Sequence, residues 1–347
     1  MLMNNRNQIV TSKKERLHWL DYSKTIGMYL VVLGHVLKDN AQLFKVVIYS
    51  FHMPLFFFLS GFLHKLKIGR GKYFLSILKQ LVIPFLIFNG LTFITKIKDI
   101  PIDGVFVVTC DFLKELGESI YLGELPIGPS WFILSLIWMK IIMFFLLRIR
   151  SDFRSLSIVG ITWVIVLAVF YTSNFPKIPN YFHLGSSLLS FPFYIAGYLL
   201  KLKYKDSVAW LKKRYWMISL IFALYLVGLS FNGFTSLEGC VVGNHVLFMY
   251  LSGICGTLLV VISTHLLKNQ NKWVYILSCG TIVILCTHGF LLNTTINKYP
   301  LFELYSVEWY SYAIIGCLVI MLIEIPVILF CSRYFKWAIG GRKIVVD

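Results

Sequence analysis

The stretch LDYSKTIGMYLVVLGHV, residues 20–36, combines a long apolar run with Asp21, Lys24 and His35. An α-helix needs about 20 residues to cross a hydrocarbon core, and this stretch approaches that length. Its apolar window, 22–37, lacks a small-residue cleavage site, and further apolar windows follow it. We therefore interpret the stretch as a retained membrane-spanning helix, and not as a signal peptide.

Similar apolar windows recur along the rest of the chain. Hydrophobic residues make up 58% of the 347 positions and charged residues 14%, whereas soluble domains carry about 25% charged residues. We expect helices over residues 22–38, 47–64, 80–96, 130–148, 156–172, 185–201, 215–231, 245–266, 274–294 and 309–331. No stretch remains for a soluble domain. The sequence predicts an all-α polytopic membrane helix bundle of about ten transmembrane helices, with one domain over residues 1–347.

The connections between these windows differ in charge. Cytoplasmic loops of membrane proteins collect Lys and Arg. Most of the 33 Lys and Arg residues fall in alternate connections, namely 6–16, 65–79, 148–154, 201–214, 268–272 and 333–343. All of these lie on one side if the N-terminus is inside. We therefore expect an integral protein of the plasma membrane, in bacteria the inner membrane, with both termini cytoplasmic.

The connection 97–129 is long and acidic. It contains Asp99, Asp103, Asp111, Glu115, Glu118 and Glu124. Charge alternation assigns it to the external side, and its apolar stretch 105–108 predicts a short amphipathic or re-entrant element there, because loops of this length are often functional.

Composition excludes several other classes of protein. The net charge of +17 would fit a nucleic-acid partner only if the basic residues formed one solvated face, and here they are scattered between apolar windows. The seven Cys residues lie mostly inside those windows, without CxxC spacing. The histidines do not form an HExxH motif. We therefore expect no nucleic-acid partner, no disulfide framework and no metal site.

Polar residues inside apolar windows are the main functional candidates, because ionisable groups at membrane depth are costly. Lys24 and His35 are almost three helical turns apart, so they share one face at a separation of about 16 Å along the axis. Asp21 and Lys24 lie near the expected inner end, and His35 lies near the outer end. Two other interpretations stay open: Asp21 and Lys24 pair or snorkel to the headgroups, and His35 is a structural histidine.

The second window contains FHMPLFFFLSGFL, residues 51–63. His52 follows a short external connection, so we expect it at a depth similar to that of His35. The residue before a proline disfavours helix, which predicts an irregular outer turn at His52 and Met53, before Pro54. Ser60 lies deeper, where a small residue favours either close helix packing or a direct role in a site.

Two later stretches add further candidates. In GPSWFILSL, residues 128–136, Trp131 is expected at the outer interface, where aromatic rings are also enriched for purely physical reasons. In SCGTIVILCTHGF, residues 278–290, Thr281 comes early in an apolar helix and His288 falls in its outer half.

Together these stretches resemble the acyltransferase 3 family of membrane-integral acyltransferases. Members carry a basic residue followed, after ten intervening residues, by His, and Lys24 and His35 fit that spacing. The stretches 51–63, 128–136, PFYIAGYLLK at 192–201 and the run ending at His288 are similar to later family motifs, in the expected order.

The sequence also departs from the family pattern. An Arg-x-x-Arg pair often precedes the third helix of members, whereas YFLSILKQLVIP, residues 73–84, has Lys79 as its one basic residue. Lys24 replaces the commoner Arg, which keeps the charge but loses the planar bidentate fork.

The resemblance implies transfer of an acetyl or other short acyl group from cytoplasmic acyl-CoA, with acetyl-CoA as the expected donor, to a hydroxyl of a cell-surface or lipid-linked glycan. It implies His35 as general base or transient acyl carrier, supported by His52 and His288. The expected donor contacts are Lys24, Asp21 and Lys79, and the expected architectural residues are Ser60, Trp131 and Thr281. The partners are acyl-CoA, the glycan acceptor and membrane lipid, with no bound cofactor; the oligomeric state is open, a dimer included.

A transporter of a polysaccharide or small polar solute is the competing interpretation. It also explains polar residues inside a bundle, but it predicts flux without covalent change and usually internal repeats, and we find none in the sequence by eye. A haem protein with His35 and His288 as axial ligands is a further alternative, which visible absorption would reveal.

Overall fold

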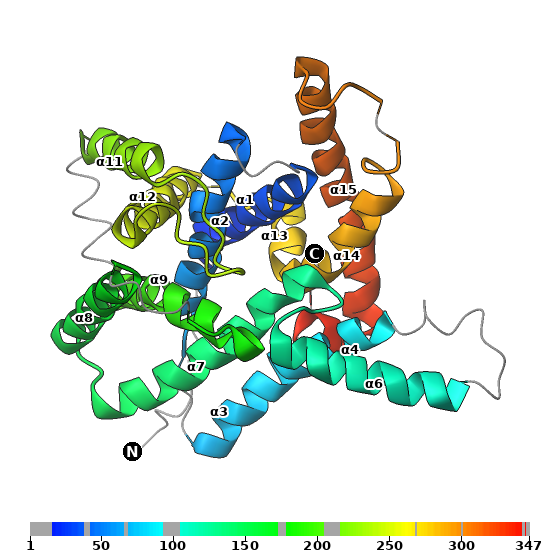
Figure 1. Cartoon of the computed structure of the whole chain (residues 1–347), viewed down its shortest axis with the longest axis horizontal. Coiled ribbons are helices and arrows are strands. Elements are labelled where there is room, and N and C mark those ends of the chain that lie inside the picture. Colours follow the sequence, from blue (N-terminus) through cyan, green and yellow to red (C-terminus); the bar gives the residue numbers. More distant parts are fainter. Residues whose placement is uncertain are drawn as a thin grey trace, which may run out of the picture.

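The computed structural model describes residues 16–37, 42–65, 69–92, 105–172, 178–204, 216–267, 269–299, 301–341 and 344. Helices dominate these residues (Figure 1). The elements are α1 (His18–Val36), α2 (Leu43–Phe62), α3 (Arg70–Ile77), the π-helix η1 (Leu78–Val82), α4 (Ile83–Leu91), α6 (Val105–Leu122), η3 (Gly128–Ser130), α7 (Trp131–Ile149), α8 (Phe153–Thr172), η4 (Tyr181–His183), α9 (Leu184–Leu202), α11 (Trp216–Asn232), α12 (Val246–His265), α13 (Lys272–Cys279), α14 (Thr281–Thr294), α15 (Val307–Tyr334) and η5 (Lys336–Ile339).

Each of the ten predicted segments coincides with helical structure, which confirms the all-α prediction. Within the described residues, 6 helices are long and apolar enough to cross a membrane, and the bent pair of α13 and α14 makes up to 7. Helices α1 and α9 carry more polar side chains, and α11 is shorter. The count of ten crossings therefore stays a prediction.

Helix α2 lies at the centre of the bundle, where it packs against α1, α9 and α12. Glycines allow its closest crossing, which is with α9. A Cβ atom on Gly61 would collide with the backbone carbonyl of Tyr194, and one on Gly197 would collide with that of Phe58. Backbone therefore meets backbone at this crossing, as in membrane helix pairs that meet at small residues.

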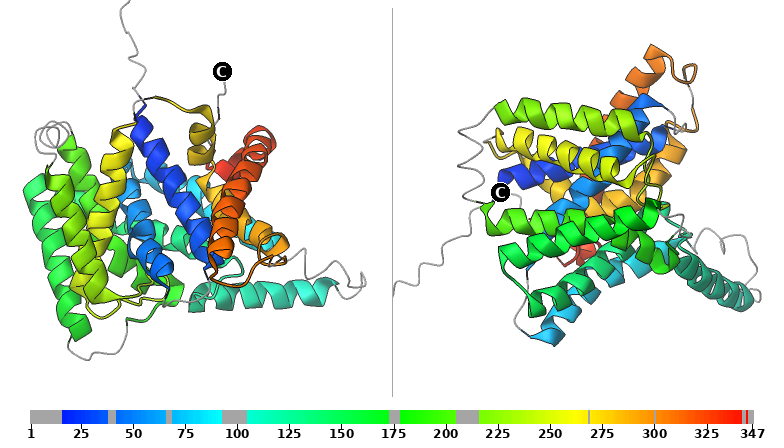
Figure 2. Two further views of the ribbon diagram at one scale, coloured as in Figure 1. Left: turned by 90° about the horizontal axis from the view of Figure 1, so that it is seen from above. Right: turned by 60° about the vertical axis from the view of Figure 1, so that its left-hand side comes forward.

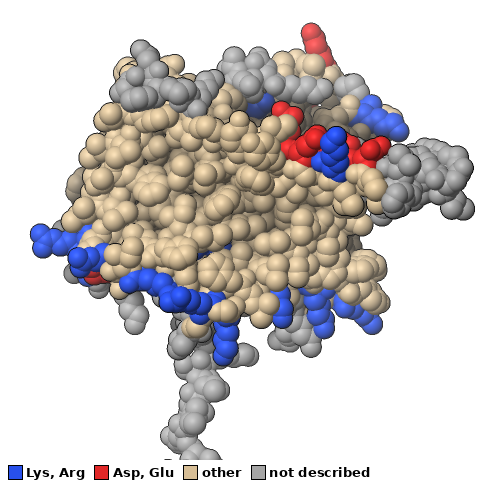
Figure 3. Space-filling view, turned by 60° about the horizontal axis from the view of Figure 1, so that its bottom comes forward, with Lys and Arg blue, Asp and Glu red and all other residues tan. Residues whose placement is uncertain are grey.

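On the face that Figure 3 shows, a broad band without charged side chains lies between two charged borders. Lys and Arg side chains follow one border, and Asp and Glu gather near the other. The start of α1 and the end of α15 lie toward one edge of the bundle, whereas α6 runs crosswise along the opposite edge (Figure 2). The expectation that the first of these edges is cytoplasmic stays a prediction.

The long connection contains α6, an 18-residue helix. Asp111, Glu115 and Glu118 are exposed on it, and Phe112 is buried. Exposed acids along one side of a helix that also carries a buried ring are the pattern of an amphipathic helix. Asp99, Asp103 and the side chains of residues 105–108 lie outside the described residues.

Three local features differ from the prediction. Helix α2 continues through Pro54, so the irregular turn expected at His52 and Met53 is wrong; neighbouring helices cover the site and make a proline tolerable. The third window begins early, at Arg70, and passes through η1 before Pro84. The ninth apolar window is broken at Gly280, where the chain bends by 86° between α13 and α14.

Candidate active site

A small cavity lies among the helices α1, α2 and α7 and the connections that the sequence predicts to be external. We call it the outer chamber; it is lined by Val31, His35, Tyr49, His52, Met53, Pro129, Trp131, Ser236, Leu237, Glu238 and Leu285. Its volume is about 20 Å³, which is room for one water molecule or one hydroxyl group. The structure thus brings His35, His52 and Trp131 together.

Gly34 explains why His35 and His52 meet although they belong to different helices. A Cβ atom on Gly34 would lie 3.1 Å from the Tyr49 ring and 3.4 Å from Ile48. Helix α1 therefore packs closely on the turn of α2 that directly precedes His52, and His35, the next residue, reaches the same cavity.

Two of the three candidate histidines have a defined ring orientation. The Nδ1 atom of His52 lies 2.8 Å from the carbonyl oxygen of Ile48, and Nδ1 of His288 lies 2.7 Å from that of Ile284. A carbonyl oxygen only accepts hydrogen bonds, so Nδ1 carries the hydrogen in both rings. The lone pair of each neutral ring is therefore on Nε2.

His288 lies behind His35, with the ring centroids 5.2 Å apart. It is buried, and its Nε2 atom has no hydrogen-bond partner among the described residues. Leu285, almost one turn earlier on α14, lines the outer chamber. The structure thus places His35 near both His52 and His288.

Hydrogen bonds from the buried side chain of Asn89 fix the position of Trp131 at the start of α7. The side chain of Asn89 donates to Ser130 Oγ at 3.1 Å and accepts from the backbone N–H of Ile127, also at 3.1 Å. These bonds fix the η3 turn and therefore the first residue of α7. The Trp131 ring then contacts Phe57, at a centroid separation of 6.0 Å.

A second cavity lies farther along α1, toward its N-terminal end. We call it the inner chamber; its volume is about 190 Å³, and its lining includes Lys24, Ser60, Gln80, Lys140, Cys279, Thr281 and Gly340. Three residues predicted from separate stretches, Lys24, Ser60 and Thr281, therefore share one cavity. Two lysines give this cavity a basic character.

Asp21 does not pair with Lys24 in the described structure but with Arg16. Arg16 Nε and Nη2 lie 2.6 Å and 2.8 Å from its two carboxylate oxygens. The hydroxyl of Ser278 donates to the same carboxylate at 2.5 Å. Asp21 thereby joins α1 to α13, immediately before the bend at Gly280, and this junction sets the position of Thr281.

Lys79 lies outside the inner chamber. It is exposed on η1, and its neighbour Gln80 lines the cavity instead. A π-helix rotates the chain relative to an α-helix, so the face on which a residue falls could not be obtained from α-helical periodicity.

Aromatic rings separate the two chambers. Trp131 lines the outer chamber, and the next residue, Phe132, lines the inner one. The rings of Phe57 and Phe132 lie 4.9 Å apart, and those of Phe56 and Phe132 lie 5.8 Å apart. We call these packed rings, Phe56, Phe57, Trp131 and Phe132, the aromatic wall.

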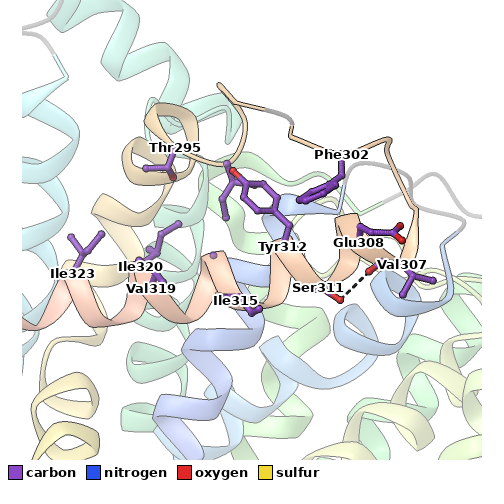
Figure 4. Close-up of a pocket in the computed structure, with 12 residues that line it drawn as sticks. Thr295, Phe302, Val307, Glu308, Ser311, Tyr312, Ile315, Val319, Ile320 and Ile323 are labelled. Atoms are coloured by element: carbon purple, nitrogen blue, oxygen red, sulfur yellow. Dashed lines mark hydrogen bonds between the residues drawn. The ribbon is translucent and has the colours of Figure 1, made fainter.

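A larger groove of about 640 Å³ lies elsewhere, along α15 (Figure 4). Its lining is mostly aliphatic, with Glu308, Ser311 and Tyr312 toward one end, and Ser311 donates to the carbonyl of Val307. It holds none of the candidate residues. Among the residues that the structure describes, no group of three His, Cys, Asp or Glu side chains could hold a metal ion.

The sequence did not predict Glu238, Tyr49, Gln80 or Lys140 as parts of a site. Glu238 comes from a short connection, where an acidic residue carries no helical periodicity. The one signal was its place in SLEGC, residues 236–240, a turn-like stretch between two apolar windows.

The sequence of this chain is similar to those of known proteins. Residues 17–328 match a family model described as an acyltransferase domain. The chain is 28% identical over 226 residues to the nodulation protein NolL of Mesorhizobium japonicum, covering 61% of this chain and 56% of that protein. It is 30% identical over 193 residues to NolL of Sinorhizobium fredii, covering 52% and 47%.

The chain thus spans about half the length of the curated relatives that it matches. No solved structure matches it. The family match covers Lys24, the outer chamber, most of the inner chamber and all three candidate histidines, in agreement with the resemblance in sequence. The chain belongs to the acyltransferase 3 family.

Proposed function

We propose that this protein transfers an acetyl or other short acyl group from acyl-CoA to a hydroxyl of a cell-surface or lipid-linked glycan. The observation that carries this proposal is the pair of chambers along α1, a basic one at Lys24 and a histidine-lined one at His35. Such a pair suits a donor and an acceptor that approach from opposite sides of a membrane.

The inner chamber is assigned to the donor. Lys24 and Lys140 supply positive charge for the CoA phosphates, and the exposed Lys79 meets phosphate outside the cavity. Asp21 is a positioning residue that holds α1 against α13 and so fixes Lys24. The acylated arm of the donor then extends past Ser60 and Thr281 toward the aromatic wall beside Trp131.

The outer chamber is assigned to the transfer itself. The acceptor hydroxyl gives its proton to His35, and its oxygen attacks the thioester carbonyl. The C–O ester bond forms as the C–S bond breaks, and the proton passes from the imidazole to the sulfur as CoA leaves. If His35 instead carries the acyl group, the bond from its ring nitrogen to the acyl carbon forms as the C–S bond breaks and CoA leaves as the thiolate. The acceptor oxygen then attacks the acyl carbon, the C–N bond breaks, and the hydroxyl proton passes to the thiolate. His52 and His288 stabilise the imidazole and the acceptor through Nε2.

Replacement of His35 by alanine tests the proposed chemistry. We expect His35→Ala to abolish the acyl ester on the surface polysaccharide of the host, because general acid–base catalysis contributes about 10²- to 10⁴-fold. The matched control is His245→Ala, which removes an exposed imidazole from the connection before α12. Both variants must reach the membrane at wild-type levels. Undiminished ester in His35→Ala would reject the assignment.

Replacement of Lys24 by leucine tests the donor site. We expect Lys24→Leu to raise the acetyl-CoA concentration needed for half-maximal transfer, since an ion contact with phosphate is lost. Lys114→Leu, at an exposed position of α6, is the control. An unchanged dependence on acetyl-CoA would show that Lys24 does not contact the donor.

A further inference from the structure

Glu238 is a carboxyl group in the outer chamber that the proposed chemistry leaves without a role. It lies on the connection between α11 and α12, and it lines the chamber together with His35, Tyr49 and His52. Among the described residues, none donates a hydrogen bond to its carboxylate oxygens. A half-buried acid to which no described residue donates a hydrogen bond, beside candidate catalytic imidazoles, has the features of a ligand-binding group.

The backbone around Glu238 is firmly held. Ser236 and Val241 exchange two backbone hydrogen bonds of 2.8 Å, which close the turn that carries Glu238. The carbonyl oxygen of Glu238 accepts from Asn180 Nδ2 at 2.7 Å and from Ser186 Oγ at 2.9 Å. The connection before α9 and the first turn of α9 thus fix this turn, and Glu238 lines the chamber from a fixed backbone position.

The surroundings of Glu238 also change the pKa of its carboxyl group. Burial raises its pKa from 4.5 to about 7, so the acid and the carboxylate are both populated near neutral pH. The titratable or charged groups around it are His35 of α1, Tyr49 and His52 of α2, Cys240 of its own turn, His183 beyond Asn180, and Lys45, which lies over the Tyr49 ring.

The size of the chamber limits what can reach this carboxylate. A volume of about 20 Å³ accepts one hydroxyl group but not a sugar ring. A ring that stays at the mouth can still present a neighbouring hydroxyl to Glu238 while one hydroxyl enters toward His35. Ionised carboxylates only accept hydrogen bonds, which suits hydroxyl donors.

We propose that Glu238 is the acceptor-binding residue of the outer chamber and that its carboxylate accepts a hydrogen bond from a sugar hydroxyl and so orients the hydroxyl to be acylated. This inference rests on the proposed function. It assigns the recognition of the acceptor to the connection between α11 and α12 and leaves the donor to the inner chamber.

The test compares Glu238→Gln with Glu303→Gln, which alters an exposed acid on another connection. The full-length protein is used in membrane vesicles, with acetyl-CoA as donor. The acceptor probe is host surface polysaccharide from which mild base has removed all esters. Two quantities are measured for each variant, the KM for this polysaccharide and the Kd for acetyl-CoA.

We expect Glu238→Gln to raise the KM for the polysaccharide about 10- to 100-fold, the loss typical of a hydrogen bond to a charged group, with the Kd for acetyl-CoA unchanged. Glu303→Gln should match the wild type in both. If Glu238→Gln also matches the wild type, the role of Glu238 is wrong while the proposed function stands. Two other results would instead reject the proposed function. In one, the wild type does not bind acetyl-CoA; in the other, it binds acetyl-CoA but leaves the polysaccharide unmodified.

Discussion

At the scale of single residues, the candidate site consists of side chains that are held in a fixed position. His52 and His288 each use Nδ1 to hold a carbonyl oxygen of their own helix, which leaves Nε2 for other partners. Glu238 is held by its backbone, which leaves its carboxyl group free of hydrogen bonds from the described residues. Fixed position combined with an unused polar atom is the common property of these residues.

The raised pKa of Glu238 predicts how acceptor binding depends on pH. A carboxyl group with a pKa of about 7 is mostly neutral below that pH and mostly ionised above it. If the carboxylate binds the acceptor, the KM for the polysaccharide should fall as the pH rises through about 7. Initial rates between mildly acidic and mildly basic pH measure this change.

The variant Glu238→Gln provides the control for this pH dependence. It keeps His35, Tyr49, His52, His183, Cys240 and Lys45, so any change in KM that those groups cause should persist in it. The fall that belongs to Glu238 should disappear. An identical profile in the variant and the wild type would assign the titration to another group.

The sequence predicted part of this site. Lys24 and His35 could be found because both lie on one helix, where spacing along the chain determines the face. Glu238 could not be found in that way, because its role arises when two outer connections and α2 meet in three dimensions. Asp21 was assigned to the donor, but Arg16 and Ser278, which are far apart in the sequence, jointly bind it.

At the scale of elements, the crossing of α2 and α9 allows a direct test. Gly61→Val introduces atoms where the carbonyl of Tyr194 already lies. Because the two backbones are in contact, the helices must separate, and overpacking of this kind costs about 1–3 kcal/mol or more. We expect a lower melting temperature and less folded protein in detergent.

Gly90→Ala is the matched control, because a Cβ atom there meets no neighbouring atom within 4 Å. It should melt at least as high as the wild type, since alanine favours helix over glycine. Equal melting temperatures for Gly61→Val and the wild type would contradict the close crossing.

Hydropathy predicted where the helices are better than where they break. The apolar windows located all ten segments, since apolar composition over the length of a span is a strong signal. The uninterrupted helix at Pro54 and the bend at Gly280 were missed for one reason. A proline or glycine shows where the chain is free to bend, but the surrounding packing decides whether it does; at Gly280, Ile328 occupies the space that a side chain would need.

At the scale of the whole molecule, the charge pattern predicts an orientation. In a variant without the exposed Cys110, we expect Gly239→Cys to react with a membrane-impermeant maleimide on intact cells. Ser151→Cys, in the exposed connection between α7 and α8, should react only after permeabilisation. The reverse pattern would overturn the assignment of the cytoplasmic side.

The aromatic wall between the chambers has a consequence for proton leakage across the membrane. If the two cavities joined, they would form a pore. A continuous file of water between Lys24 and His35 would then conduct protons down the membrane potential. The packed rings of Phe57 and Phe132 interrupt that file with groups that offer protons no site. Under the proposed function, a slender donor arm that displaces the rings would also fill the space that it opens, so the donor could pass without a proton leak.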